Sequence, residues 1–379
     1  MRDAWQLDDS IHFLNHGSFG ATPRAVLEKQ RALRDQLEAE PVRFMVRELE
    51  PLLDAARARL ASFIGAQPAD LAFVPNATTG VNAVLRSLEF VPGDELLTTS
   101  HGYNACTNVL RYVAERTGAR VVIAPVPFPV ENEEVLAKAV LAAVTPRTRL
   151  VMLDQITSPT ALIFPIARLV RELEGRGVHV LVDAAHAPGH LPLSLDATGA
   201  SFTTGNLHKW VCAPKGAAFL HVRKDWQDRI RPPVISHGAN SKRTDRSRFQ
   251  LEFDWTGTHD PTAYLCVPTA LDVMGSLLPG GWPALMAANH EGAVQARQAL
   301  LEAFPQALPC PPQLLGAMAT VVVPNALTDL ADRLFHEFRI EVPVIPFGGL
   351  TLVRVSSQRH VRAGDVEALV RALRKLVNG

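Results

Sequence analysis

The chain lacks net charge, long apolar runs and cysteine-rich segments. Its 379 residues include 38 basic and 38 acidic side chains, so the formal net charge is zero. Nothing in this balance suggests a nucleic-acid or anionic-membrane partner. No apolar run reaches the roughly 18 residues that a membrane span requires. We therefore expect neither a nucleic-acid-binding protein nor a membrane protein.

Disulfides, metal sites and export are also unexpected. The four cysteines form no C-x-x-C pair and have no histidine partners at zinc spacing. The N-terminal sequence MRDAWQLDDS carries aspartate where a signal peptide has its apolar stretch. These features predict a cytoplasmic protein that holds no metal ion.

From about residue 70 onwards, the chain alternates short apolar segments with helical segments. Strands are expected at 71–75, 94–99, 119–125, 148–154, 178–184, 201–204 and 216–222. Helices are expected at about 78–89, 104–117, 132–143 and 166–174. This alternation is typical of an α/β fold with a mostly parallel central sheet flanked by helices.

The two ends of the chain have a different pattern. Residues 23–40 read as one amphipathic helix. From about residue 282, two long helical stretches surround the apolar segment 319–324. A strand at 350–357 and a last helix at 364–377 follow. The pattern predicts a smaller α+β domain built from the C-terminal part.

Lys209 is the first candidate for chemistry. It lies in TTGNLHKW (203–210), between His208 and Trp210 and shortly before an apolar strand. A lysine beside an aromatic ring and a buried strand can lose solvent, which lowers its pKa and frees the amine for a Schiff base. The alternative is an ordinary solvated surface lysine.

Asp183 is the second candidate. It closes the apolar segment 178–184, and open α/β sheets bind ligands at the carboxyl ends of their strands. It lies 26 residues before Lys209 (209 − 183 = 26), and it could alternatively cap the next turn. A buried aspartate that pairs with a pyridinium nitrogen accompanies the Schiff-base lysine in pyridoxal phosphate chemistry. The two residues together therefore indicate this cofactor.

A phosphate site is the third candidate feature. In PNATTGVN (75–82), Ala77, Thr78 and Thr79 would begin a helix, whose free backbone N–H groups favour a phosphate. The alternative is a simple N-cap formed by Asn76 or Thr78. Neither a G-K-[ST] phosphate loop nor a G-x-G-x-x-G fingerprint is present, which argues against a nucleotide-binding protein.

Arg354 is a fourth candidate because it lies inside the apolar strand segment VRVSS (353–357). A buried arginine needs an anionic partner. That partner is either an internal carboxylate or the carboxylate of an amino-acid substrate, which a guanidinium can hold through two hydrogen bonds.

These residues lie in segments that resemble one known family. The segments are FLNHGSFGATP (13–23), NATTGVNAVLRSL (76–88), TSPTALIFPI (157–166), VDAAHAPG (182–189), GNLHKWVCAPKGAAFL (205–220) and WTGTHDPTAYL (255–265). They are similar to the class V aminotransferase superfamily, and within it to the isopenicillin N epimerase-like group. The resemblance runs nearly end to end. It implies the fold of a fold-type I transferase that depends on pyridoxal 5'-phosphate (PLP).

The resemblance also implies a domain organisation. An N-terminal segment (1–20) would contribute to the active site. A large PLP-binding domain (21–280) and a small α+β C-terminal domain (281–379) would follow. Gly257 and Thr258 of such enzymes reach the phosphate in the neighbouring subunit, so a homodimer with shared active sites is expected.

Roles for single residues follow from the same resemblance. Lys209 would hold the cofactor as a Schiff base, Asp183 would keep the pyridine nitrogen protonated, and His186 would lie near the ring and its phenolic oxygen. Residues that would contact the phosphate are Ala77, Thr78, Thr79, Asn206 and His208.

The remaining contacts concern the ring and the substrate. Tyr103, or alternatively His101, would stack on the ring face. Ser158, or its neighbour Thr157, would face the phenolic oxygen. Arg354 would hold the substrate α-carboxylate. Further candidates for the substrate pocket are Asn15, His16 and Arg43. The chain departs from the group at Gln358-Arg359-His360-Val361, where relatives often carry an aromatic residue followed by asparagine.

The reaction is the least determined part of the prediction, because one fold hosts several. Every reading begins with Lys209 taking a proton from the substrate α-carbon. Return of the proton from the opposite face gives an epimerase or racemase, our main hypothesis, and requires a second acid such as Tyr103 or a histidine. Return to the cofactor gives an aminotransferase, and loss of a β-substituent gives a C–S lyase.

Two further alternatives are disfavoured. A cysteine desulfurase needs a nucleophilic cysteine shortly before the arginine strand, and residues 342–357 contain none. Cys106 and Cys212 are expected to be packing residues. A non-enzymatic binding protein on this fold would be expected to lack the lysine, aspartate and phosphate-loop set, which is present here.

Overall fold

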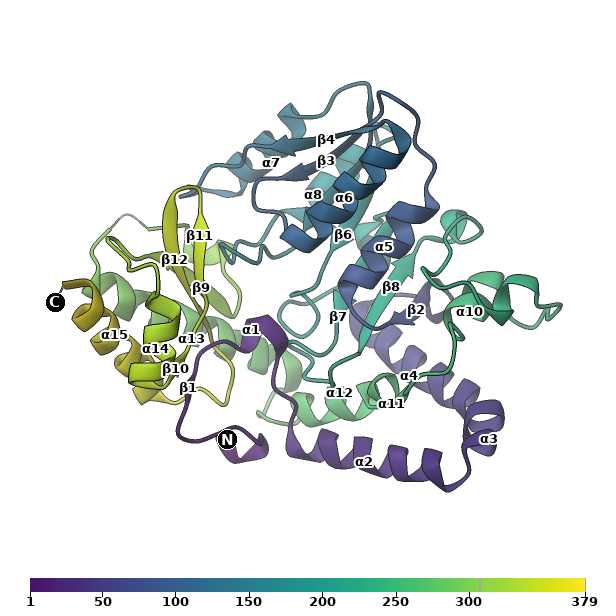
Figure 1. The fold of residues 1–379 in the computed structure, drawn as a ribbon, viewed down its shortest axis with the longest axis horizontal. Helices are drawn as coiled ribbons and strands as arrows, with labels where there is room; N and C mark the ends of the chain where they lie inside the picture. The colour runs from purple at the N-terminus through teal and green to yellow at the C-terminus, as the bar shows by residue number, and fades with distance from the viewer. Residues whose placement is uncertain (307, 379) are drawn as a thin grey trace.

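The computed structural model describes residues 1–306 and 308–378. Its centre is a seven-stranded sheet of order β2-β8-β7-β6-β5-β3-β4 (Figure 1). The strands are β2 (Leu71–Val74), β3 (Glu95–Thr99), β4 (Arg120–Ala124), β5 (Thr148–Asp154), β6 (His179–Asp183), β7 (Phe202–Asn206) and β8 (Ala218–Val222). Strand β8 is antiparallel to both of its neighbours, and the pairs from β7 to β4 are parallel. The predicted α/β fold with a mostly parallel sheet is confirmed.

Helices on both faces explain why the middle strands are almost wholly apolar. They are α5 (Ala77–Ser87), α6 (Asn104–Thr117), α7 (Glu133–Ala142), α8 (Ile166–Glu174) and the short α9 (Leu195–Thr198). Side chains alternate along a strand. In β5, Leu150 and Met152 pack in one apolar cluster with α5 and α6, whereas Val151 and Leu153 pack in another with α7 and α8. A strand buried on both sides therefore reads as one continuous apolar run.

The C-terminal part forms a second, antiparallel sheet of order β11-β12-β9. Its strands are β9 (Met318–Val322), β11 (Val344–Phe347) and β12 (Leu350–Ser356), and its helices are α13 (Gly281–Ala303), α14 (Leu330–Phe338) and α15 (Ala363–Asn378). Gly348 and Gly349 both have positive φ, 56° and 81°, which suits a tight two-residue hairpin turn between β11 and β12. The sequence pattern predicted β9, β12 and α15 but not β11.

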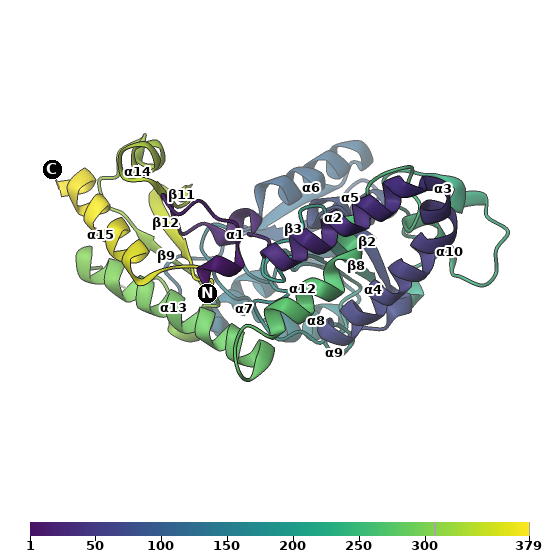
Figure 2. The same cartoon turned by 90° about the horizontal axis from the view of Figure 1, so that it is seen from below.

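The N-terminal segment connects the two parts. Strand β1 (His12–Phe13) pairs in parallel with β10 (Ile340–Glu341), and the short helix α1 (His16–Phe19) follows. Helix α2 (Arg24–Ala39) then runs along the large part, as Figure 2 shows. The remaining helices are α3 (Pro41–Arg43), α4 (Leu49–Ile64), α10 (Arg248–Phe253), α11 (Thr262–Leu265) and α12 (Val267–Gly275). The predicted helix at 23–40 is therefore α2, whereas the two-residue strands were not predicted.

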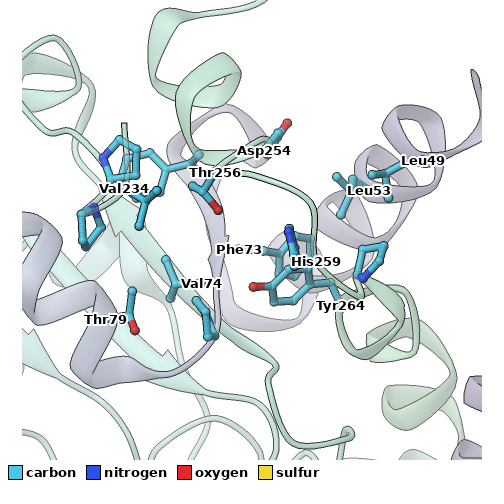
Figure 3. Close-up of a pocket in the computed structure, with 15 residues that line it drawn as sticks. Leu49, Leu53, Phe73, Val74, Thr79, Val234, Asp254, Thr256, His259 and Tyr264 are labelled. Atoms are coloured by element: carbon cyan, nitrogen blue, oxygen red, sulfur yellow. The ribbon is translucent and has the colours of Figure 1, made fainter. Parts of the chain in front are cut away.

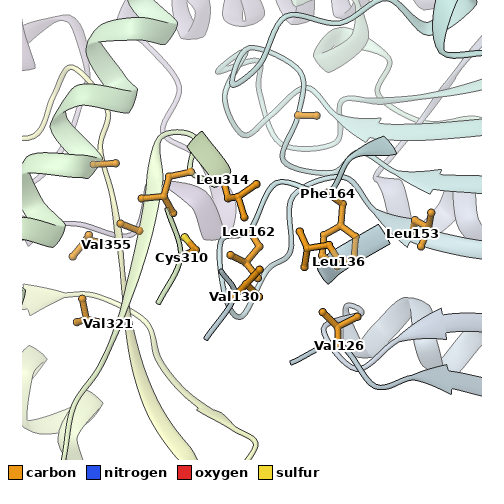
Figure 4. Close-up of a cluster of buried hydrophobic side chains, with 14 of the residues drawn as sticks. Val126, Val130, Leu136, Leu153, Leu162, Phe164, Cys310, Leu314, Val321 and Val355 are labelled. Atoms are coloured by element: carbon orange, nitrogen blue, oxygen red, sulfur yellow. The ribbon is translucent and has the colours of Figure 1, made fainter. Parts of the chain in front are cut away.

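One apolar cluster extends from the large sheet to the C-terminal sheet (Figure 4). Leu136 and Leu153 belong to the large part, and Val321 and Val355 belong to strands of the small sheet. The predicted boundary at residue 281 coincides with the first residue of α13, although the core is continuous across it. The division into domains therefore stays a prediction. Among the described residues, no helix is both long and apolar enough to cross a membrane.

This core generates a stability prediction. Leu136 is fully buried, so Leu136→Ala should lower the free energy of unfolding by about 2–5 kcal/mol through lost burial and a residual cavity. Leu327 is 37% exposed, and Leu327→Ala should change it by no more than about 0.5 kcal/mol. Urea denaturation of both variants measures the difference. Equal losses would contradict the assignment of Leu136 to the core.

Candidate active site

A cavity of about 400 Å³ opens at the carboxyl ends of β5, β6 and β7. Ligands of open α/β sheets bind at this edge. The lining residues come from distant segments: Ser18, Phe19, Pro75, Asn76, Ala77, Thr78, Tyr103, Asp154, Ile156, Ser158, Asp183, Ala185, His186, Asn206, His208, Lys209 and Gly216. The fold thus brings most of the predicted cofactor residues to one place.

Lys209 lies three residues after β7, and its Nζ atom is 3.2 Å from Nε2 of His186. Burial, and after it the positive charge of Arg354, lower the pKa of Lys209 to about 7. Asp183 acts in the opposite direction. A much larger share of the amine is therefore unprotonated at neutral pH than in a solvated lysine, as a nucleophilic lysine requires.

Asp183 ends β6 and is only 3% exposed. Its Oδ1 atom accepts a hydrogen bond from the backbone N–H of Ala185 at 2.9 Å, and its Oδ2 atom accepts one from the thiol of Cys106 at 3.1 Å. Burial raises the pKa of Asp183, whereas these two donors favour the ionised form. Cys106 is therefore more than a packing residue, because its thiol favours the ionised form of Asp183.

His186 presents a neutral ring to the same space. Burial lowers its pKa well below the usual range, and the charge of Lys209 lowers it further. Its Nδ1 atom is buried and has no hydrogen-bond partner among the described residues. A buried nitrogen without a partner is costly, so a polar group of a ligand would stabilise it.

The start of α5 forms another wall. The backbone N–H of Ala77 donates to Oδ1 of Asn206 at 2.9 Å, which ties the helix to the end of β7. Asn76 caps the helix by accepting from the N–H of Thr79 at 2.8 Å, as the alternative reading proposed. Ala77 and Thr78 line the cavity, whereas Thr79 lines a neighbouring pocket. The helix N-terminus therefore supplies a partial positive charge at the cavity.

The groups in this cavity fit PLP. A lysine amine, a buried carboxylate, a helix N-terminus and an unpartnered imidazole nitrogen match its aldehyde, its pyridine nitrogen, its phosphate and a polar ring substituent. His208 also lines the cavity, and burial lowers its pKa to about 4, so its ring is neutral at pH 7.

Two candidate residues were predicted for the contact with the ring face, and two for the contact with the phenolic oxygen. In each case only one of the two lines the cavity. Tyr103 lines the cavity, whereas His101 is fully buried elsewhere and contacts Thr160 and the carbonyl of Val126. Ser158 also lines the cavity. The hydroxyl of Thr157 instead contacts Thr160 and the backbone of Leu162. The positions favour Tyr103 and Ser158 as the ligand contacts.

Arg354 lies directly behind two serines of the lining. Its guanidinium donates to the carbonyl and hydroxyl of Ser158 at 2.5 and 3.1 Å, and to the hydroxyl of Ser18 at 3.1 Å. Burial lowers the pKa of Arg354 to about 10, so it is charged at neutral pH. No carboxylate of the described residues forms an ion pair with it, and its Nε has no partner. A buried cation of this kind suits an anionic ligand.

The other predicted substrate residues lie outside the lining. Asn15 donates to Glu341 at 2.8 Å and accepts from Ser18. His16 is fully buried, and Nε2 contacts the carbonyl of Lys209 at 3.0 Å. Arg43 is exposed and pairs with an acidic residue of its own helical segment. Their predicted role in substrate binding is not tested by these positions.

The segment Gln358–Val361 contacts residues that pack against the lysine loop. His360 contacts Nδ1 of His16 at 3.0 Å, and Gln358 contacts the buried Cys212. This segment therefore packs behind the lysine loop, through His16 and Cys212.

Gly257 and Thr258 do not line the cavity of their own chain. In the sequence they lie between Thr256 and His259, and these two flanking residues line a second pocket, which Figure 3 shows. Its walls are largely apolar and include Leu49, Leu53, Phe73, Val74 and Val234. Gly257 has a φ of 122°, a conformation that favours glycine. A contact from these residues to a second subunit stays a prediction.

Several lining residues were not predicted from the sequence, among them Ser18, Phe19 and Asp154. Ser18 and Phe19 belong to the segment FLNHGSFGATP (13–23), which carried part of the family resemblance, but only Asn15 and His16 of that segment were singled out. Asp154 ends an apolar strand in the same way as Asp183 does, so the signal that identified one carboxylate was also present for the other.

The titration of Lys209 is directly testable. In the cofactor-free protein, labelling of Lys209 by an amine reagent should rise through a midpoint near pH 7 and level off above it, because only the free amine reacts. Arg354→Gln removes the repelling charge and should raise the midpoint. Mass spectrometry of the labelled peptide reports both. A midpoint near the ordinary lysine value of 10.5 would refute the desolvated site.

Gly20 tests the packing of the N-terminal segment on the lysine loop. A Cβ atom there would lie 2.0 Å from the carbonyl oxygen of His208 and 2.9 Å from Cα of Lys209. Gly93 also has positive φ but an open surrounding, so Gly93→Ala is a matched control that should cost about 1–2 kcal/mol of unfolding free energy. Gly20→Ala should cost more and shift the Lys209 labelling curve. Equal losses in urea denaturation would exclude the proposed close packing.

Comparison with known proteins agrees with this geometry. Residues 13–277 match the family model for aminotransferase class-V. Isopenicillin N epimerase from Amycolatopsis lactamdurans is 34% identical, and the match covers 99% of this chain and 97% of that protein. L-cysteine desulfhydrase from Arabidopsis thaliana is 29% identical, with coverage of 96% and 87%. A solved structure of a C-DES mutant with glycine covalently linked to the PLP cofactor has a TM-score of 0.85 at 21% identity, with 99% of both chains covered. This likeness confirms the predicted fold-type I architecture. The chain therefore belongs to the class-V aminotransferase family of PLP-dependent enzymes.

Proposed function

We propose that the chain is an epimerase or racemase that acts at the α-carbon of an amino acid or amino-acid-derived substrate, as isopenicillin N epimerase does. The observation that carries the proposal is the desolvated Lys209 amine, which shares one cavity with Asp183 and His186. The identity of 34% over 99% of the chain supports the epimerase reading, and a putative L-cysteine desulfhydrase from Oryza sativa at 33% identity gives the C–S lyase comparable support.

In this proposal Lys209 is the base that takes the proton from the substrate α-carbon, because its pKa of about 7 leaves the amine free. Asp183 would hold the cofactor at its pyridine nitrogen and favour the protonated form of that nitrogen. Arg354 pairs with the substrate carboxylate, and Ser18 and Ser158 give up their present bonds to it. The cofactor, when bound, supplies an electron-accepting ring that stabilises negative charge at the α-carbon.

Epimerisation also needs a proton donor on the other side of the substrate. Tyr103 follows β3, which neighbours β5, whereas Lys209 follows β7, which neighbours β6. The two side chains therefore enter the cavity from opposite sides of the β5–β6 pair. Burial raises the pKa of Tyr103, so its phenol is protonated at neutral pH. We propose Tyr103 as the second acid.

A C–S lyase is the second candidate, and an aminotransferase is the third. Similarity to L-cysteine desulfhydrase favours the lyase. A persulfide-forming desulfurase has less support, because all four cysteines are buried and none lines the cavity. The tight β11–β12 hairpin before Arg354 also contains no cysteine.

We further propose a cytoplasmic homodimer with shared active sites. The position of Gly257 and Thr258 outside their own cavity supports this arrangement, because a second subunit could bring them to the cofactor phosphate. Exposed Arg43 could contact a neighbouring site in the same way.

The reaction is tested by incubating the PLP-loaded protein with isopenicillin N, L-cysteine and a panel of L-amino acids in D2O. An epimerase gives deuterium at the α-carbon together with the opposite configuration on chiral chromatography. A C–S lyase gives sulfide, and an aminotransferase gives a keto acid. Sulfide or keto acid without inversion would overturn the main proposal.

Lys209→Ala is the matched control for this assay. It should abolish both the visible absorbance of bound PLP and all turnover, because the amine that holds the cofactor is also the proposed base. Full activity in this variant would refute the role of Lys209.

A further inference from the structure

We propose that Asp154 is a permanently protonated carboxylic acid, which leaves Asp183 as the single anion of the carboxyl pair at the ends of β5 and β6. In this role Asp154 is a positioning residue that sets the charge of its neighbour. The inference extends the proposed function. It rests on that function in one respect, which is that this cavity is the cofactor site.

The two carboxyl groups are direct neighbours in the sheet. Asp154 ends β5, Asp183 ends β6, and the two residues are paired in register on parallel strands. Adjacent strands lie about 4.8 Å apart. Both side chains point to the same face, because Met152 and Leu181, two residues earlier in each strand, pack in the cluster of α5 and α6.

Neither carboxyl group has access to much water. Asp154 is 4% exposed and Asp183 is 3% exposed. Two carboxylates held this close in a poorly solvated site cannot both ionise, so one of them keeps a proton.

The hydrogen bonds decide which residue keeps it. Asp183 accepts from two donors, one on each oxygen, at 2.9 Å from Ala185 and 3.1 Å from Cys106. Asp154 accepts from one donor, the backbone N–H of Tyr103, at 3.1 Å on Oδ2. Its buried Oδ1 has no partner among the described residues. Donors stabilise the ionised form, so the charge belongs on Asp183 and the proton on Asp154.

The electrostatic surroundings agree with this assignment. Burial and then the charge of Asp183 raise the pKa of Asp154 well above its usual range. The titratable groups that line the same cavity or contact the pair are Tyr103, Cys106, His186, His208 and Lys209. The described residues place no arginine in an ion pair with Asp154.

A protonated Asp154 has two consequences for the site. Its buried Oδ1 becomes an O–H donor on a residue that lines the cavity, while Oδ2 accepts from the backbone N–H of Tyr103. The negative charge at the end of β6 also stays on one residue, where it can favour a protonated pyridine nitrogen. A second negative charge, on Asp154, would make the pyridine nitrogen depend less on Asp183. It would also favour the protonated form of Lys209.

Infrared spectroscopy of the cofactor-free protein at neutral pH tests the assignment. The wild type should show the carbonyl stretch of a buried protonated carboxylic acid. Asp154→Asn, which keeps an acceptor for the Tyr103 N–H, should lose this band. Asp183→Asn is the matched control and should keep it, because burial is the larger cause of the raised Asp154 pKa. Loss of the band in Asp183→Asn but not in Asp154→Asn, or no band in the wild type, would overturn the inference.

PLP titration gives a second readout. Asp154→Asn is neutral like the protonated acid, so its dissociation constant should stay within about twofold of the wild type, whereas Asp183→Asn should bind about tenfold to a hundredfold more weakly. Equal weakening in both variants would contradict a neutral Asp154. Failure of the wild type to bind PLP would defeat the proposed function instead, and the infrared result would stand independently of it.

Discussion

The removal of water from charged side chains at the carboxyl ends of β5, β6 and β7 is the constraint on which the site depends. Lys209 and Asp183 would be an ordinary ammonium and an ordinary carboxylate in solvent. In the cavity, burial lowers the pKa of the amine to about 7 and raises that of the acid. The hydrogen bonds from Ala185 and Cys106 then hold Asp183 in its charged form. The same desolvation makes a second charge on Asp154 unfavourable.

Three separate parts of the fold maintain this constraint. The parallel strands bring their polar terminal residues to one edge, and α5 adds the partial charge of its N-terminus. The N-terminal segment contributes Ser18 and Phe19 to the lining and packs Gly20 against the lysine loop. That segment is itself held by the pairing of β1 with β10. The C-terminal part therefore acts on the site through contacts with the N-terminus and through Arg354.

Local patterns predicted the elements that are long, buried on two faces or strongly amphipathic. The helix α6 at Asn104–Thr117 has the predicted bounds, as does α8 at Ile166–Glu174. Strands β1 and β10 were missed because each has two residues, and their pairing joins positions more than 300 residues apart, such as His12 and Ile340. Asp154 was missed for a different reason. Its position at the end of an apolar strand was visible, but only the pairing of β5 with β6 makes it a neighbour of Asp183.

The sequence by itself determined the α/β class and, through its family resemblance, the cofactor, and it identified the candidate residues for the site. Those features depend on local periodicity and on motifs whose residues lie close together in the chain. The tertiary structure decided which alternatives reach the cavity: Tyr103 rather than His101, Ser158 rather than Thr157, and His16 behind the lysine loop rather than in the lining. It also decided the ionisation of Lys209 and Asp183. Burial and charge proximity set a pKa, and both exist only after distant segments have packed together.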